Sequence, residues 1–137
     1  MFGISALVIA AFTLLSGLGG NYRELANQAV KQFHEQLAAG QYVAIYDGAD
    51  ESLRKATSES DFVNLLESMD QKLGTFEGSN PNFTGITWGK NHEVTVRLTF
   101  DANFANGTGT EDFVWRIVNN RATLSRYQIK SKVLTAK

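Results

Sequence analysis

Residues 33–50, FHEQLAAGQYVAIYDGAD, join two helical patterns through Gly40 and determine how the first half of the chain folds. Upstream of this glycine, apolar residues recur at three- and four-residue spacing after a candidate N-cap, Asn21, and so share one helical face: Leu25, Ala26, Ala29, Val30, Phe33 and Leu37. Gly40 can adopt the left-handed conformation in which many helices end. The stretch therefore predicts a long amphipathic helix from Tyr22, a turn, and a second helical piece of about one turn with Tyr42, Ile45 and Tyr46.

The next helical pattern is the most regular in the chain. A short turn around Leu53 precedes it, and Ser58 is placed to cap it, with Asp61 three residues later as a capping-box partner. Gly74 ends the pattern. Its apolar stripe has the spacing of a helix that faces a core: Phe62, Leu65, Leu66, Met69 and Leu73. The stripe predicts a packed structural helix and needs no functional explanation.

After Gly74 the apolar period changes from helical to two, which indicates strands with one buried face. We expect strands at about residues 83–88, 93–100, 112–117 and 121–132. Asn119 and Asn120 form a two-residue hairpin turn, since asparagine tolerates a positive φ, and broken alternation in the last strand predicts a bulge. Helices followed by an antiparallel meander predict an α+β fold, with N-terminal helices packed on a sheet of about four strands.

Length and composition favour one ordinary globular domain. The chain has 137 residues, a formal net charge of -1 and no cysteine. Acidic and basic residues are interspersed without a basic stripe, so we expect no nucleic-acid partner. The absence of cysteine excludes disulfides, thiolate metal sites and a cysteine nucleophile.

The first twenty residues differ in composition from the rest. They carry no charged side chain, and residues 4–15 form an apolar run. That run has the length of a signal-peptide core and is short for a membrane span of roughly 20 residues. We therefore expect residues 1–20 to be a signal peptide or an N-terminal membrane anchor, with one α+β domain at 21–137. The protein would be exported, and any membrane contact would be made through this segment.

Three segments carry a family resemblance over roughly residues 22–132: FHEQLAAGQYVAIYDGAD, SLRKATSESDFVNLLESMDQKLG and EDFVWRIVNNRATLSRYQIKSKV. They resemble the nuclear-transport-factor-2-like, or cystatin-like, superfamily, and within it small exported bacterial proteins of unknown function. The resemblance implies a cone, in which a curved sheet wraps around the long helix and leaves a pocket at its wide end. It also implies a homodimer through the open sheet face, and residues 1–20 add the expectation of a periplasmic or membrane-associated location. Catalytic superfamily members use an Asp or His in the cone, but no such motif maps onto this chain residue by residue.

Six residues are candidates for ligand binding. Two phenols and a carboxylate near a cone mouth could hold a small polar or aromatic molecule, a helix histidine could act as a base or ligand contact, and two indoles could form pocket walls: Tyr42, Tyr46, Asp47, His34, Trp88 and Trp115.

Each candidate also has a structural explanation. The tyrosines could pack the helices on the sheet, Asp47 could cap the turn at Gly48, His34 could be a partly exposed helix residue, and the tryptophans could be core. His34 and His92 lack the spacing of a metal site, and no motif indicates a cofactor or a catalytic set.

Three functions remain open from the sequence. The first is a non-enzymatic exported module that binds a small molecule or an envelope protein. The second is a small isomerase or dehydratase that uses Asp47, with His34 and a tyrosine. The third is a structural subunit anchored in the membrane by its N-terminal segment.

Overall fold

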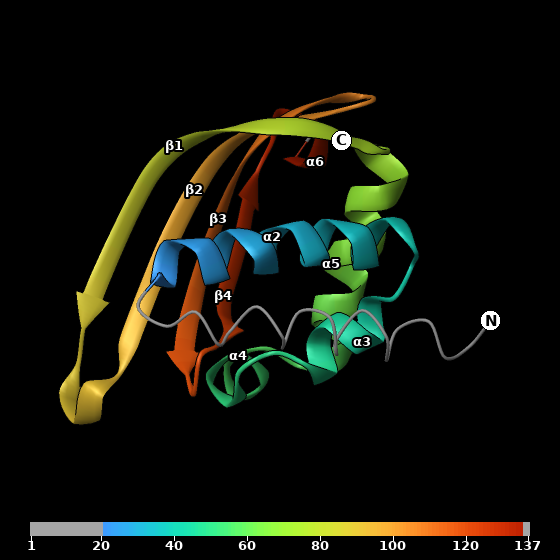
Figure 1. Ribbon diagram of the computed structural model, residues 1–137. Helices are drawn as coiled ribbons and strands as arrows, with labels where there is room; N and C mark the ends of the chain where they lie inside the picture. Colours follow the sequence, from blue (N-terminus) through green and yellow to red (C-terminus); the bar gives the residue numbers. More distant parts are fainter. Residues whose placement is uncertain (1–20, 136–137) are drawn as a thin grey trace.

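The computed structural model describes residues 21–135. In chain order, its elements are α2(Tyr22–Ala38), α3(Tyr42–Asp47), α4(Glu51–Ala56), α5(Glu59–Lys72), β1(Phe76–Trp88), the 3₁₀ turn η2(Lys90–His92), β2(Val94–Phe104), β3(Gly107–Val118), β4(Arg121–Lys130) and α6(Lys132–Thr135). Helices come first and the sheet follows, which confirms the α+β class (Figure 1). The expected signal peptide or anchor lies outside the described residues.

The sheet is an antiparallel meander in the order β1-β2-β3-β4, curved and unclosed. Figure 1 shows α2 lying across its concave side, beneath the arch of β1, with α5 at one end. The β3–β4 turn has Asn119 and Asn120 at φ 51 and 59, as predicted. The predicted bulge is also present, as a register shift between Val114 and Trp115.

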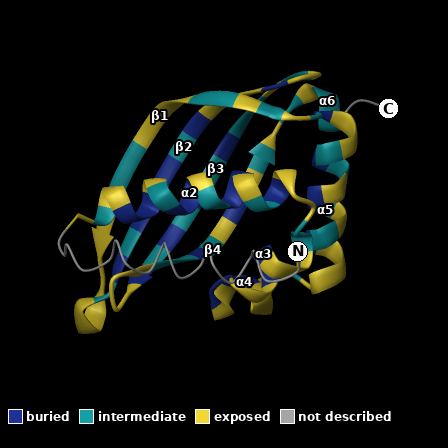
Figure 2. Cartoon of the chain, turned by 45° about the vertical axis from the view of Figure 1, so that its right-hand side comes forward, coloured by how far each residue is buried: buried dark blue, intermediate teal, exposed yellow. Residues whose placement is uncertain are grey.

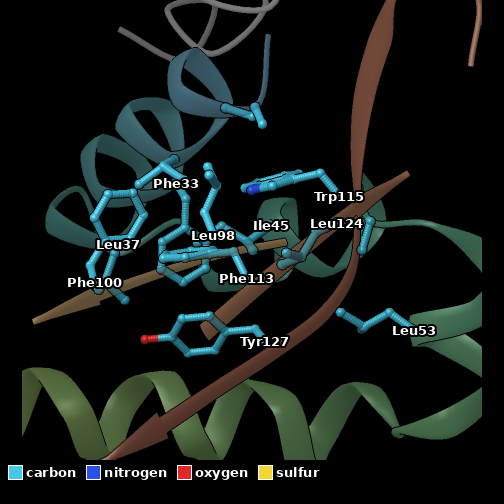
Figure 3. Packing of buried hydrophobic residues seen from close by; sticks show 14 of the residues in the cluster. Phe33, Leu37, Ile45, Leu53, Leu98, Phe100, Phe113, Trp115, Leu124 and Tyr127 are labelled. Atoms are coloured by element: carbon cyan, nitrogen blue, oxygen red, sulfur yellow. The ribbon is translucent and has the colours of Figure 1, made fainter. Parts of the chain in front are cut away.

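The core lies between α2, α5 and the inner face of the sheet. Alternate residues of β2 and β3 point inward, which gives the blue stripes of Figure 2. Phe33 of α2 packs edge-on against Phe113 at 5.2 Å between ring centroids and contacts Tyr127 at 4.7 Å (Figure 3). Trp115 stacks beside Phe113 at 5.8 Å. Burying such large rings supplies most of the stabilisation that apolar area provides.

Helix ends follow the local sequence. Asn21 accepts a hydrogen bond from the Glu24 amide at 3.1 Å, and Ser58 accepts one from the Asp61 amide at 3.2 Å. Gly40 and Gly74 have φ values of 71 and 78 after their helices, which a side chain would strain. These predicted caps and stops are confirmed. They could be predicted because each depends on residues within one turn of the helix end.

Two features of β1 differ from expectation. The strand starts at Phe76, seven residues before the predicted 83, and includes Pro81. An edge strand accepts a proline where its backbone faces away from the neighbouring strand or sits in a bulge, and a register shift lies between Pro81 and Phe83. Trp88 at the strand end is 66% exposed, so it is not a core residue.

Candidate functional site

The two tyrosines of the predicted site point toward neighbouring helices. The Tyr42 hydroxyl donates to Asp70 Oδ2 of α5, and this hydrogen bond to a carboxylate raises the pKa of Tyr42 to about 12. The buried Tyr46 hydroxyl lies 2.7 Å from the carbonyl oxygen of Thr57 and 3.1 Å from that of Arg54. Both phenols therefore fasten α3 to the helices around it.

Asp47 stands apart from these phenols. It is exposed at the end of α3, and its carboxylate makes no hydrogen bond to any described residue. It does not cap the turn at Gly48, whose amide binds the carbonyl oxygens of Ala44 and Tyr46. The structure brings neither His34 nor a tyrosine hydroxyl into hydrogen-bond contact with Asp47.

The two tryptophans also separate. Trp88 packs edge-on against Tyr22 at 5.3 Å on the surface. Trp115 is 5% exposed in the core. Among residues 21–135, its Nε1 is the one buried side-chain nitrogen or oxygen that lacks a hydrogen-bond partner. An indole N–H can only donate, and leaving it unpaired costs about 1–3 kcal/mol.

Trp115 lines a cavity of about 120 Å³ between α2, α3 and the β3–β4 end, which we call the Trp115 cavity. Its walls are mainly apolar, with Gln32, Gln36, Arg121 and Thr123 as polar groups. The predicted fold-determining stretch contributes its small residues, since Ala44, Gly48 and Ala49 line the cavity, whereas Tyr42, Tyr46 and Asp47 do not. Small residues on α3 and just after its end are the sequence feature that leaves this space.

A second feature, the buried His34–Glu111–Tyr127 network, joins three elements. Glu111 of β3 is fully buried. His34 Nε2 of α2 lies 2.8 Å from its Oε1, and the Tyr127 hydroxyl of β4 donates to its Oε2 at 2.6 Å. The Tyr127 hydroxyl also lies 3.6 Å from Met69 Sδ. Burial, and the charge and hydrogen bond of Glu111, hold the pKa of Tyr127 well above its usual range.

His34 is therefore buried, 8% exposed, and the prediction of a partly exposed histidine was wrong. Helical periodicity placed it at the margin of the apolar face, but β1 and β3 cover that margin: the ring stacks on Phe76 at 3.7 Å. Glu111 was missed from the sequence. Its position could have indicated it, since it precedes Phe113, Trp115 and Ile117 in the inward register of one strand.

An ion-pair network outside the core has a structural role. Asp50 caps α4 by accepting from the Ser52 amide and also pairs with Arg116 at 3.2 Å. Burial raises the pKa of the Asp50 carboxyl, but hydrogen bonds from Ser52, Arg116 and Thr123 outweigh it and hold the pKa below its usual range. Arg116 also pairs with Glu93 at 3.0 Å.

Within the described range, no three His, Asp or Glu side chains gather as a metal-binding group, and no helix is long and apolar enough to cross a membrane. The described residues therefore offer one cavity beside a tryptophan whose buried N–H is unpaired, and one buried acid–base network. Models of known protein families and the curated proteins give no match to this chain.

Proposed function

We propose that this protein is a non-enzymatic, exported bacterial module of the nuclear-transport-factor-2-like superfamily that binds a small molecule in the Trp115 cavity. The observation that carries the proposal is the unpaired, buried Nε1–H of a residue that lines a preformed cavity. Ligand sites are typically preformed and mainly apolar, with a few polar groups that fix orientation. The uncharged residues 1–20 support export.

The size and chemistry of the Trp115 cavity narrow the ligand class. A cavity of about 150 Å³ lined by apolar side chains accepts benzene, so about 120 Å³ suits a ring of five or six atoms. The indole N–H is a donor only and is closed to solvent. A ligand that carries an acceptor, such as a carbonyl oxygen, would pair it if the ring turned toward the cavity. We infer a small, mainly apolar ketone, ester or amide.

An isomerase or dehydratase that uses Asp47 has less support. That reaction needs a carboxylate and a histidine in one site, whereas Asp47 is exposed on α3 and His34 bonds Glu111 in the interior. An envelope-protein partner, a membrane-anchored subunit and a homodimer rest on residues 1–20 or on the family resemblance. Intact mass of the exported chain tests cleavage, and sedimentation analysis tests the dimer.

The ligand proposal is tested with cyclopentanone, and with cyclopentane as a probe of similar size that lacks the acceptor. Indole N–H resonances of the ¹⁵N-labelled protein report both tryptophans, and the Trp88 signal is the internal control because that ring lies on the surface. We expect cyclopentanone to shift the Trp115 resonance in a saturable manner and to leave the Trp88 resonance in place.

The matched variant Ala49→Leu fills the Trp115 cavity from the segment between α3 and α4 and should abolish the shift. Trp115→Phe keeps an aromatic wall without the donor and should weaken binding about 2- to 10-fold, the value of one neutral hydrogen bond. Equal binding of cyclopentanone to the native protein and to Ala49→Leu would show that the cavity is not the site.

A further inference from the structure

An open groove, which we call the α2–β1 groove, lies between α2 and β1 beside His34. Figure 1 shows β1 passing over α2 at this place. The groove is lined by Val30, His34, Phe76 and Phe100, with Lys31 and Glu35 among its polar groups. The His34 ring stacks on Phe76 with an interplanar angle of 7°, so its orientation is fixed by packing as well as by Glu111.

The second nitrogen of His34 is open to this groove. Nε2 is occupied by Glu111, and Nδ1 has no hydrogen-bond partner among the described residues. Among the described residues, Trp115 Nε1 is the one side-chain nitrogen or oxygen that is both unpaired and closed to solvent. An unpaired Nδ1 that was also closed to solvent would be a second such atom. Nδ1 is therefore reached by solvent, and the groove that His34 lines is the opening for it.

The buried partners decide what Nδ1 can do. The Tyr127 hydroxyl donates to Glu111 Oε2 at 2.6 Å, so that oxygen is used as an acceptor. When Glu111 is ionised it is an acceptor only, and His34 Nε2 then carries the proton that joins the two groups. In the neutral imidazole Nδ1 then holds a lone pair. A carboxylate that fixes a histidine tautomer in this way also stabilises the imidazolium that forms after proton transfer.

We propose that His34 Nδ1 is the proton-accepting group of a binding site for phenols in the α2–β1 groove. The phenol ring lies against Phe76 and Val30, and its hydroxyl donates to Nδ1. Proton transfer breaks the O–H bond, forms an Nδ1–H bond and leaves a phenolate beside an imidazolium that is paired with Glu111. This site is independent of the Trp115 cavity, and it requires no oxidant or cofactor.

Few charged or titratable groups face His34. Glu111 and Tyr127 face it from β3 and β4, and the groove itself carries Lys31 and Glu35 on α2. The groove residues from β1 and β2 are uncharged: Phe76, Ser79 and Phe100. Lys31 is exposed and on the rim, where it adds attraction for the phenolate, and the nearby Glu35 opposes it.

The test uses 4-nitrophenol, whose absorbance changes when it ionises, at a pH where the free dye is mostly protonated. We expect the native protein to produce the phenolate absorbance in a saturable manner. His34→Gln should lose the phenolate absorbance and bind the dye at least about tenfold more weakly, as expected for a charge-assisted hydrogen bond. His92→Gln is the matched control, since His92 is exposed in η2, and it should behave like the native protein.

A second measurement needs no change at His34. Side-chain ¹⁵N resonances of the histidines, assigned with His92→Gln, should show His34 with a protonated Nε2 and a bare Nδ1 that becomes protonated when 4-nitrophenol binds. The proposal is overturned if Nδ1 carries the proton of the neutral ring, if bound dye keeps its proton, if His34→Gln retains the phenolate absorbance, or if no saturable binding occurs.

Discussion

Replacing Tyr127 with phenylalanine isolates one hydrogen bond of the buried network. The substitution removes only the hydroxyl that donates to Glu111 Oε2 at 2.6 Å. The ring keeps its contacts with Phe33 at 4.7 Å and Phe113 at 5.0 Å, so little packing is lost. Glu111 is fully buried, and no water can easily replace the lost donor.

The expected cost follows from this geometry. A hydrogen bond to a charged group contributes about 1.5–3 kcal/mol, against about 0.5–1.5 kcal/mol for a neutral one. We expect Tyr127→Phe to lower the free energy of unfolding by about 2 kcal/mol. The matched control is Tyr46→Phe, which removes the hydroxyl of a similarly buried tyrosine that bonds only the neutral carbonyl oxygens of Arg54 and Thr57. It should cost about 1 kcal/mol.

Urea unfolding at neutral pH measures both variants. With an m-value of about 1.5 kcal/mol/M, Tyr127→Phe should lower the midpoint by about 1.3 M and Tyr46→Phe by about half of that, with unchanged slopes. The reasoning is refuted if Tyr127→Phe is no more destabilised than Tyr46→Phe, since Glu111 would then be protonated or otherwise satisfied.

Three further predictions concern pH and packing. The pKa of Tyr42 is raised to about 12, and that of Tyr127 is also raised. Unfolded tyrosines ionise near about pH 10, so above that pH the unfolded chain binds fewer protons than the folded one. Urea midpoints should therefore fall as pH rises from about 10 to 12. Asp50→Ala removes a helix cap and should cost about 1–2 kcal/mol at neutral pH. Burial opposes the shift, but the pKa of Asp50 is lowered in the folded state. The contribution of Asp50 to stability is therefore present above about pH 4 and is lost as pH falls. The native protein and this variant should converge in stability toward about pH 2. Trp115→Ala should lower the free energy of unfolding by about 3–5 kcal/mol, as other buried large-to-small changes do. Trp88→Ala should change it by no more than about 1 kcal/mol, because that ring is exposed. Thermal unfolding of the two variants measures both.

Much of the fold could be predicted from local sequence. The α2 and α5 stripes, the Asn21 and Ser58 caps and the Asn119–Asn120 turn each depend on residues only a few positions apart. The early start of β1 could not, because a proline and several polar residues argue against a strand until a neighbouring strand supplies the hydrogen bonds.

The candidate sites were less predictable. The sequence identified His34 and Trp115, but it grouped His34 with Asp47 and two tyrosines that the fold directs elsewhere. It placed Trp115 among core or wall residues without indicating that its N–H would lack a partner. Side-chain direction on a strand follows from alternation, whereas the identity of the opposing atom depends on how α2 crosses the sheet.

The sequence by itself determined the order of helices and strands, their caps and turns, and which face of each element is apolar, because these follow from residue type and short-range spacing. Only the tertiary structure decided that His34 would meet Glu111, 77 positions away, and that Ala44, Gly48 and Ala49 would leave a cavity beside Trp115. Those pairings depend on the curvature of the sheet around α2, which sums contributions from all four strands. No single stretch of the chain encodes that curvature, so neither site could be read from residues 33–50 alone.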